Sequence, residues 1–209
     1  MLLYKYNIQR QSHEVFMLGK QAKVLGQQQI NSVLDYLCRT RHPIRNKTIF
    51  FLSFKAGLRA KEIACITWSM VLTPDGNVSD EIRLENAASK GRSGGVIPMS
   101  KHIKSSLEEL LASSQPVSFG GRVIQTSRSG AAEPQVIVNM FQAWYKAVGL
   151  VGCSSHSGRR TFITQAARNI GRFGGSLRDV QALARHRSLA MTQRYIDVDA
   201  EAMRKVVNL

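Results

Sequence analysis

The feature that most limits the possible folds is a change of pattern in the middle of the chain. From Trp68 to Met99, short apolar runs are separated by turn residues, whereas the flanking segments carry apolar residues at helical spacing. Two of these runs, Glu81–Glu85 and Val96–Pro98, flank the glycine-rich stretch 89–95, a pattern typical of an antiparallel hairpin. The sequence therefore predicts a mainly α fold with a small antiparallel β-sheet, of the α+β class.

Helical periodicity surrounds this sheet region. Apolar residues recur every three or four positions after Gln27, and Pro43 is expected to end that first helix. The following run is apolar enough for a buried helix that stops at Gly57. A short strand is expected at Arg122–Gln125. The predicted helices are, in chain order, 27–41, 44–55, a short one that begins at Arg59, 101–112 and 134–148.

Charge narrows the choice of partner. The chain of 209 residues has a formal net charge of +15, and 44% of its residues are hydrophobic. This combination predicts a folded protein whose surface attracts phosphates, so double-stranded DNA is the expected partner. The longest apolar stretch, Ile49 to Phe54, is far shorter than the ~20 residues of a spanning helix. We therefore expect no membrane partner and a cytoplasmic, nucleoid-associated location.

Metal and nucleotide sites are not indicated. The acidic residues are dispersed, and Cys38, Cys65 and Cys153 lie far apart, which favours neither a zinc site nor a disulfide framework. The glycine-rich stretch lacks the Gly-Lys-Ser/Thr of a phosphate-binding loop. We predict a protein without a metal or a cofactor.

The last quarter of the chain gathers side chains suited to phosphate chemistry. Three successive short helices are expected between His156 and Tyr195, and they would carry His156, Arg159, His186 and Tyr195. From His156 to the end there are ten Lys and Arg residues against four acidic ones. Such an excess of positive charge favours a polyanionic ligand.

Six residues follow one another in an order that resembles the catalytic set of the tyrosine recombinases, the phage-integrase family. Gly57–Glu62 is similar to the Gly-Leu-Arg-x-x-Glu box of that family, and 156–164 to its His-x-x-Arg-His-Thr-Phe box. The intervals from the hairpin lysine to Pro98 and from the second histidine to the tyrosine match as well. The set is Arg59, Lys90, His156, Arg159, His186 and Tyr195. Taken singly, Arg59 and Lys90 are also typical of solvated surface side chains.

The resemblance implies a fold, that of the DNA breaking-rejoining enzymes, and a role for each residue. Tyr195 would be the nucleophile, with His156 as its general base. Lys90 would protonate the departing 5′ oxygen. Arg59, Arg159 and His186 would bind the scissile phosphate, and Glu62 would orient its neighbours. Further phosphate contacts are expected from Arg92, Arg160, Arg185 and Arg187.

The chain departs from the family pattern in the second and third boxes. Ala184-Arg185-His186 stands where the family usually has Leu-Gly-His, and Arg160 where a histidine commonly follows the second arginine. Arg185 would either contact DNA or crowd the turn.

The domain layout predicted from the resemblance is an N-terminal arm, 1–25, and a catalytic domain, 26–209. This layout leaves no N-terminal core-binding domain, which most family members carry, to be expected within residues 1–25. The fimbrial-switch invertases have a similar short layout, and a fragment of a longer protein is the other explanation. The segment 197–209 is compatible with a short helix that docks on a neighbouring protomer or packs on its own domain.

Three functions are compatible with these residues. The first is a site-specific DNA recombinase, an integrase, resolvase or invertase, that acts through a covalent 3′-phosphotyrosyl intermediate and works as a tetramer on two DNA sites. The second is a non-catalytic DNA-binding accessory protein with the same fold. The third is DNA relaxation like that of a type IB topoisomerase. The presence of Arg59, Arg159 and Tyr195 argues against the accessory protein. The recombinase-like boxes and the interval from His186 to Tyr195 argue against the topoisomerase.

Overall fold

The computed structural model describes residues 22–89, 94–114, 116–126 and 130–196, together with the single residues 204 and 207. Two 3₁₀ helices accompany the α-helices and strands. The elements in chain order are α2 (Gln27–Cys38), α3 (Pro43–Ala56), α4 (Ala60–Cys65), η1 (Trp68–Met70), β1 (Glu81–Leu84), β2 (Gly95–Pro98), α5 (Lys101–Ser113), α6 (Pro134–Ala147), α7 (Ser157–Asn169), η2 (Ile170–Phe173), α8 (Leu177–Ala184) and α9 (Leu189–Gln193).

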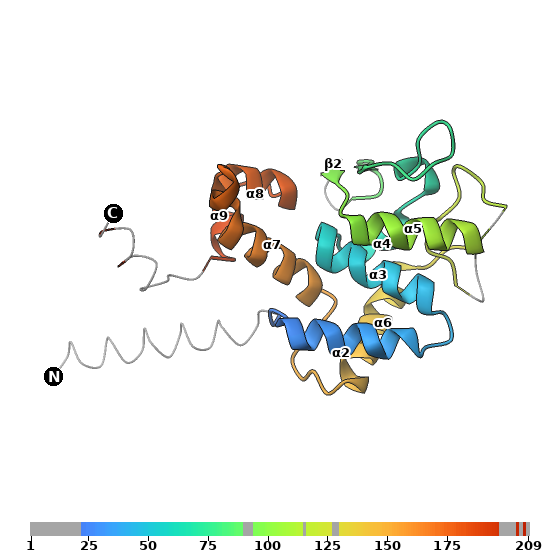
Figure 1. Ribbon diagram of the computed structural model, residues 1–209, viewed down its shortest axis with the longest axis horizontal. Coiled ribbons are helices and arrows are strands. Elements are labelled where there is room, and N and C mark those ends of the chain that lie inside the picture. The colour runs from blue at the N-terminus through green and yellow to red at the C-terminus, as the bar shows by residue number, and fades with distance from the viewer. Residues whose placement is uncertain are drawn as a thin grey trace.

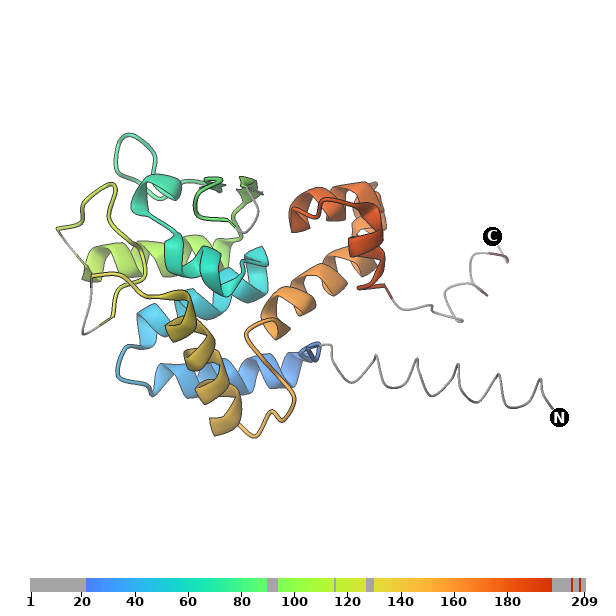
Figure 2. The ribbon, with the colours of Figure 1, turned by 180° about the vertical axis from the view of Figure 1, so that it is seen from behind.

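These elements form a main body and a smaller C-terminal lobe. The main body holds α2 to α6 and the two strands, and the C-terminal lobe (157–196) holds α7, α8 and α9 (Figure 1). The view from behind shows the same separation, with α7 running from the rest of the lobe down to the main body (Figure 2). The lobe is attached through α7, which packs on α3.

Each part has its own hydrophobic core. The main core gathers around α3, which packs on α2, α4 and α5 and whose Phe50 and Leu52 are fully buried. The C-terminal lobe buries only Ile163, Val180 and Ala184 in a separate cluster, with Tyr195 packed at its edge. Since buried apolar area is the main stabilising term, the lobe has little apolar area of its own to hold it together.

The small sheet has the predicted form. β1 pairs with β2 in antiparallel register, with Glu81 opposite Pro98 and Leu84 opposite Gly95. Ile82 and Ile97 point into the main core. The predicted α+β class is confirmed.

Several predicted boundaries differ from the structure. The first helix ends at Cys38 rather than near residue 41, because the Thr40 hydroxyl donates to the Leu37 carbonyl at 2.6 Å and closes the helix end. Pro43 does not end that helix but begins α3, where its missing N–H costs nothing. The strand expected at 122–125 is wrong, since Arg122 makes only an isolated bridge to Thr67.

Two predicted segments are largely undescribed. Apart from the single residues 204 and 207, the segment 197–209 lies outside the described residues, as do the arm residues 1–21. Within the described ranges, no helix is both long and apolar enough to cross a membrane.

Candidate active site

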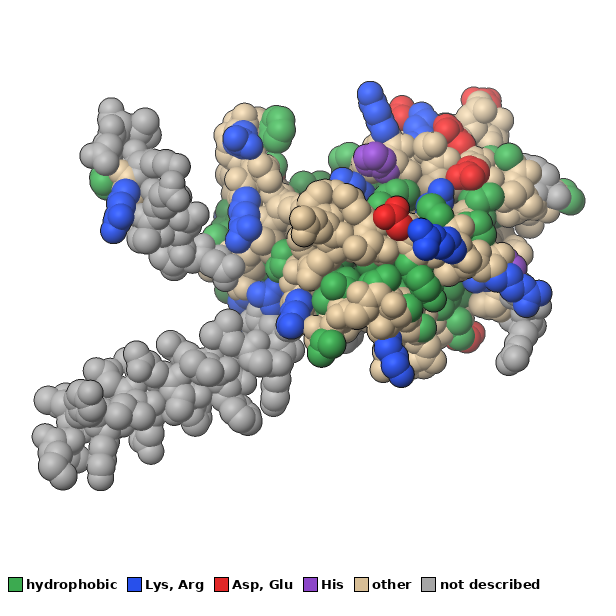
Figure 3. Space-filling view, turned by 60° about the horizontal axis from the view of Figure 1, so that its bottom comes forward, with side chains coloured by type: hydrophobic (Ala, Val, Ile, Leu, Met, Phe, Trp, Pro, Cys, Tyr) green, Lys and Arg blue, Asp and Glu red, His purple; other side chains and the backbone are tan. Residues whose placement is uncertain are grey.

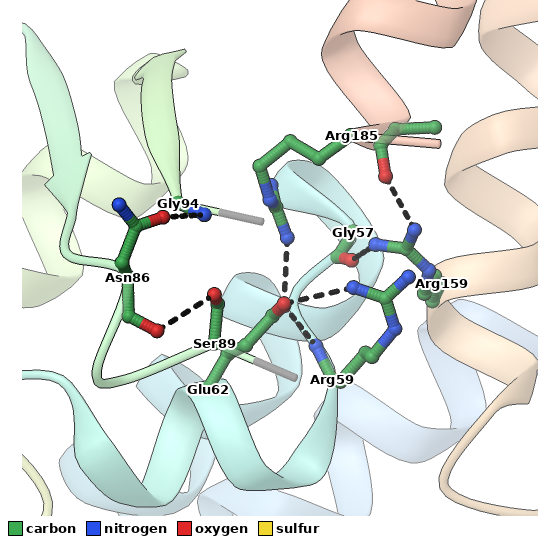
Figure 4. Close-up of polar contacts among 9 residues, drawn as sticks. Gly57, Arg59, Glu62, Asn86, Ser89, Gly94, Arg159 and Arg185 are labelled. Atoms are coloured by element: carbon green, nitrogen blue, oxygen red, sulfur yellow. Dashed lines mark hydrogen bonds and ion pairs between the residues drawn. The ribbon is translucent and has the colours of Figure 1, made fainter. Parts of the chain in front are cut away.

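A buried carboxylate lies at the centre of the site. Glu62, on α4, is fully buried, and its Oε2 accepts hydrogen bonds from the Arg59 backbone N–H at 2.8 Å and from Arg185 Nη2 at 2.7 Å. Its Oε1 accepts from Arg59 Nη1 at 2.8 Å. The bond to the Arg59 backbone caps the first turn of α4, so the helix start itself aims the carboxylate. Glu62 thus aligns two guanidinium groups from distant parts of the chain (Figure 4).

The second predicted arginine lies beside this pair. Arg159, on α7, is 4% exposed and donates from Nη1 to the Gly57 carbonyl and from Nη2 to the Ala184 carbonyl (Figure 4). Burial and, to a lesser extent, the positive charges of Arg59 and Arg185 lower the pKa of Arg159 to about 9. At neutral pH the side chain is still charged, and these two hydrogen bonds go to neutral carbonyls. An excess of positive charge therefore remains around the single carboxylate.

Two glycines allow the close approach that places Arg159. Gly57 ends α3 in the left-handed conformation, with φ 63°, and a Cβ there would lie 2.6 Å from the Phe162 ring of α7. A Cβ on Gly158 of α7 would lie 2.4 Å from the Ser53 hydroxyl of α3. Side chains at either position would push α7 away from α3 and carry Arg159 out of reach of the Gly57 carbonyl.

The second histidine and the tyrosine form a stacked pair. The rings of His186 and Tyr195 lie with centroids 5.4 Å apart and an interplanar angle of 26°. His186 is 7% exposed, and its Nδ1 lies 3.0 Å from the hydroxyl of the buried Thr192 on α9. The Thr164 hydroxyl of α7 donates to the Tyr195 carbonyl at 3.3 Å. His186 and Tyr195 lie in the segments that follow α8 and α9 rather than on the predicted helices.

The electrostatics of this pair follow from the arginines. Burial, together with the positive charges of Arg159, Arg59 and Arg185, lowers the pKa of His186 to about 4. His186 is therefore neutral at pH 7. A neutral imidazole carries one N–H, which can donate a hydrogen bond to an anion.

His156 lies at the N-terminal end of α7. It is the N-cap residue, its side chain is exposed, and its backbone N–H donates to the Ser154 hydroxyl at 3.3 Å. It precedes Arg159 by three positions, so the two residues lie about one helical turn apart on the same face of α7.

The predicted hairpin residues Lys90 and Arg92 lie outside the described residues, but both ends of their segment are described. The Asn86 Oδ1 accepts from the Gly94 N–H at 3.1 Å, and the Ser89 hydroxyl donates to the Asn86 carbonyl at 3.1 Å. Figure 4 shows this hairpin base beside Glu62 and Arg185. Asn86 therefore fixes the position from which the Lys90 segment begins.

The remaining predicted DNA contacts differ in exposure. Arg187 is exposed, Arg160 is half-buried, and the Arg185 side chain is 5% exposed and held by Glu62. Positive side chains also lie on both the lobe and the main body in Figure 3, spread over that face rather than gathered in one patch.

Sequence reasoning missed two residues of this arrangement, Asn86 and Thr192. It named Arg185 as a DNA contact but did not predict its inward-facing bond to Glu62. Asn86 carried a signal, because asparagine often bonds to backbone near its own turn. In the part of the chain that the structure describes, no three His, Cys, Asp or Glu side chains are grouped to hold a metal ion.

Comparison with known proteins gives consistent matches. The model of the phage integrase family matches residues 23–202. The tyrosine recombinase XerC of Shewanella amazonensis is 28% identical over 186 residues, which cover 88% of this chain and 59% of that protein. The chain thus spans about three fifths of the length of this curated relative.

Solved structures share the fold. The XerA recombinase crystal structure superimposes with a TM-score of 0.67 and 20% identity, covering 90% of this chain and 63% of that one. The Tn1549 transposon integrase in complex with a circular intermediate DNA gives a TM-score of 0.68 and 15% identity, covering 90% and 66%.

Proposed function

The chain belongs to the phage integrase family, and from this premise we propose that it is a site-specific DNA recombinase. It cuts and rejoins double-stranded DNA through a covalent 3′-phosphotyrosyl intermediate on Tyr195. The catalytic domain is 26–209, preceded by an arm at 1–25. The recombinase and integrase matches support this function and do not favour the two alternatives, an accessory protein or a relaxing topoisomerase.

One observation carries the proposal. Segments far apart in the sequence bring the two arginines to the stacked His186 and Tyr195 rings, whose centroids are 5.4 Å apart. Arg159 donates to the carbonyl of Ala184, two residues before His186, and Arg59 shares Glu62 with Arg185. A nucleophile, a neutral histidine and an excess of guanidinium groups are what metal-free cleavage of a phosphodiester requires.

Each residue has a role in the first transesterification. The guanidinium groups of Arg59 and Arg159 bind the non-bridging oxygens, whose charge grows in the pentavalent transition state. The Tyr195 oxygen bonds to phosphorus while His156 accepts its proton. The bond from phosphorus to the 5′ oxygen breaks, and Lys90 supplies the proton that leaves a 5′ hydroxyl.

Thr192 is placed to set the tautomer of His186. Its hydroxyl lies 3.0 Å from Nδ1, and when this hydroxyl donates to Nδ1 the single ring proton lies on Nε2. That N–H donates to the scissile phosphate. The lowered pKa keeps the ring in this neutral form at physiological pH.

Rejoining reverses the step with a different partner. A 5′ hydroxyl from a second duplex attacks the phosphotyrosyl bond, and Tyr195 is released. Because the bond energy is kept in that linkage, no ATP is consumed. Two rounds of exchange between two DNA sites use four protomers.

DNA affinity comes from the phosphate backbone. The net charge of +15 and the predicted contacts from Arg92, Arg160 and Arg187 favour binding that weakens as salt rises. The Tn1549 integrase is described in complex with DNA, which supports the same class of ligand here. Such a protein works in the cytoplasm, associated with the nucleoid.

The test is to trap covalent protein–DNA adducts. Cells that express the chain are lysed in denaturant, the protein is precipitated, and the attached DNA is sequenced. We expect adducts at a short recurring site, absent in Tyr195→Phe, which removes only the attacking oxygen. Tyr36→Phe, the same change at a half-buried position on α2, is the matched control and keeps the adducts.

The alternatives give different outcomes. DNA binding with no adduct from the unaltered chain indicates the accessory protein. Relaxation of a supercoiled plasmid that carries no recombination site indicates the topoisomerase-like reaction. Adducts that persist in Tyr195→Phe contradict the assignment of the nucleophile.

A further inference from the structure

Arg185 has an unusual backbone conformation. It ends α8 with φ 52° and ψ 46°, and among the described residues it is the non-glycine residue with positive φ. Glycine is preferred in this conformation because a Cβ is strained there. The tyrosine recombinases, which this chain resembles, usually have glycine at this position. The chain therefore keeps a strained side chain where none is needed to end the helix.

The side chain reaches across from the lobe to the main body. Its Nη2 donates to Glu62 Oε2 at 2.7 Å, and the two residues are 123 positions apart in the sequence. The Arg185 side chain is 5% exposed and Glu62 is fully buried. Along its path it passes β2, where a Cβ on Gly95 would lie 3.7 Å from Arg185 Cδ. Figure 4 shows this crossing between the hairpin base and α4.

This arrangement is not optimised for stability. Nε and Nη1 of Arg185 are buried and have no hydrogen-bond partner among the described residues. Burial lowers the pKa of Arg185, which indicates that the charged form is poorly solvated there. A buried ion pair with unsatisfied donors seldom adds to folding stability, so another reason for keeping Arg185 is required.

The part of the lobe that carries His186 has few contacts of its own to hold it against the main body. α8 packs on α7 and on α9, over a cluster of three buried apolar residues. The carbonyl of Ala184 is held by Arg159, and the side chain of the next residue is held by Glu62. These two successive anchors lie directly before His186.

We propose that Arg185 is a positioning residue: its ion pair with Glu62 fixes the segment that carries His186 and Tyr195 against Arg59. Glu62 then holds Arg59 with one oxygen and Arg185 with the other, so one carboxylate sets the spacing between phosphate-binding and nucleophile-bearing parts. Arg185 acts through Glu62 and does not contact DNA. The inference rests on the proposed function for its catalytic consequence, but the connection itself is measurable without DNA.

Hydrogen–deuterium exchange tests the connection. Arg185→Gln keeps the strained backbone and most of the side-chain volume but removes the charge. We expect amides of 177–196 to exchange about fivefold faster or more in this variant, while those of α3 are unchanged. Arg178→Gln, which removes an exposed charge from the same helix, is the matched control. Equal exchange of 177–196 in Arg185→Gln and the unaltered chain overturns the proposal.

The catalytic consequence is tested on a duplex that contains the site found by adduct sequencing. Single-turnover adduct formation by Arg185→Gln and Arg185→Gly is expected to be slower by about tenfold or more at saturating DNA, because the nucleophile is misplaced. The dissociation constant for the duplex should be unchanged within about twofold. Arg185→Lys is expected to recover part of the rate.

Arg185→Gly separates positioning from folding. It relieves the left-handed strain and removes the unsatisfied donors, so its melting temperature should be equal to or higher than that of the unaltered chain. A residue needed only for folding would lower the rate and the melting temperature together. A full rate in Arg185→Gly overturns the proposal. If the unaltered chain forms no adduct, the proposed function fails, and the exchange measurement still decides whether the connection exists.

Discussion

The Nη1 nitrogen of Arg159 donates to the carbonyl oxygen of Gly57, a residue 102 positions earlier in the chain. The bond joins the C-terminal end of α3 to the first turn of α7. It makes the orientation of a predicted phosphate-binding arginine depend on the backbone of the glycine that opens the Gly-Leu-Arg box. The conformation of Gly57 is therefore part of the site.

Gly57→Ala is expected to destabilise the protein by about 3 kcal/mol. Left-handed backbone with a Cβ costs about 1 to 2 kcal/mol, and the new methyl group would lie 2.6 Å from the Phe162 ring. Urea unfolding measures the loss. Gly76→Ala is the matched control, because Gly76 has φ 81° and a Cβ there would have no atom within 4 Å. Gly76→Ala should lose only the stability that the left-handed backbone strain accounts for. Equal losses of stability in the two variants would contradict the close contact with Phe162.

Local pattern was enough to predict most helices and the sheet. The apolar spacing of 27–41 and 134–148 and the glycines at 89–95 reflect the contacts of each segment with the core. The segment 122–125 failed because its apolar residues Val123 and Ile124 are buried in the main core without pairing along a strand. A short apolar run indicates burial, and it does not reveal whether a partner strand is present.

The site was predictable in its order but not in its contacts. The spacing of the boxes indicated that Arg59, Arg159, His186 and Tyr195 belong together. It did not indicate that Arg185 turns inward, because the choice depends on a backbone conformation that sequence does not specify for arginine. The Thr192 contact was equally hidden, since it depends on how α9 is placed against His186.

Replacing either phosphate-binding arginine should lower the rate of adduct formation much more than the affinity for DNA. We expect Arg59→Ala and Arg159→Ala to slow adduct formation by about 10² to 10³, the usual loss for one donor to a developing oxyanion. Lysine at either position should recover little, because an ammonium lacks the bidentate fork. Arg83→Ala, which removes an arginine side chain that is 73% exposed on β1, is the matched control. Full activity with lysine at either position would refute the phosphate-binding role.

His186 should make folding stability fall at acidic pH. Its pKa is lowered from 6.5 to about 4 in the folded chain, so between these values the unfolded chain binds a proton that the folded chain does not. The free energy of unfolding therefore decreases as pH falls from 6.5 towards 4, by about 1 to 2 kcal/mol after allowance for solvent screening. Urea unfolding at several pH values measures this slope.

His186→Gln should flatten that slope, because glutamine does not titrate. His102→Gln removes an exposed histidine of α5 that stacks on Phe51, and it serves as the matched control. A slope that is the same in His186→Gln and the unaltered chain would show that His186 does not titrate in this window.

Lys90 should be dispensable when the leaving group needs no acid. Lys90→Ala is expected to slow cleavage of a normal duplex by about 10² to 10⁴. Replacing the bridging 5′ oxygen with sulfur gives a thiolate leaving group, which is far less basic than an alkoxide and departs without a proton. The variant should then cleave nearly as fast as the unaltered chain, whereas Arg159→Ala stays slow on both duplexes. Equal slowing of Lys90→Ala on oxygen and sulfur would exclude the general-acid role.

Asn86 should influence the same step from the hairpin base. Its Oδ1 holds the Gly94 N–H at 3.1 Å, so Asn86→Ala frees one end of the segment that carries Lys90. We expect adduct formation on the oxygen duplex to fall by about tenfold, with recovery on the sulfur duplex, because only the placement of the acid is disturbed. Asn77→Ala, in the exposed turn before β1, is the matched control. A loss that sulfur does not recover would mean that Asn86 supports the fold of the site rather than the position of Lys90.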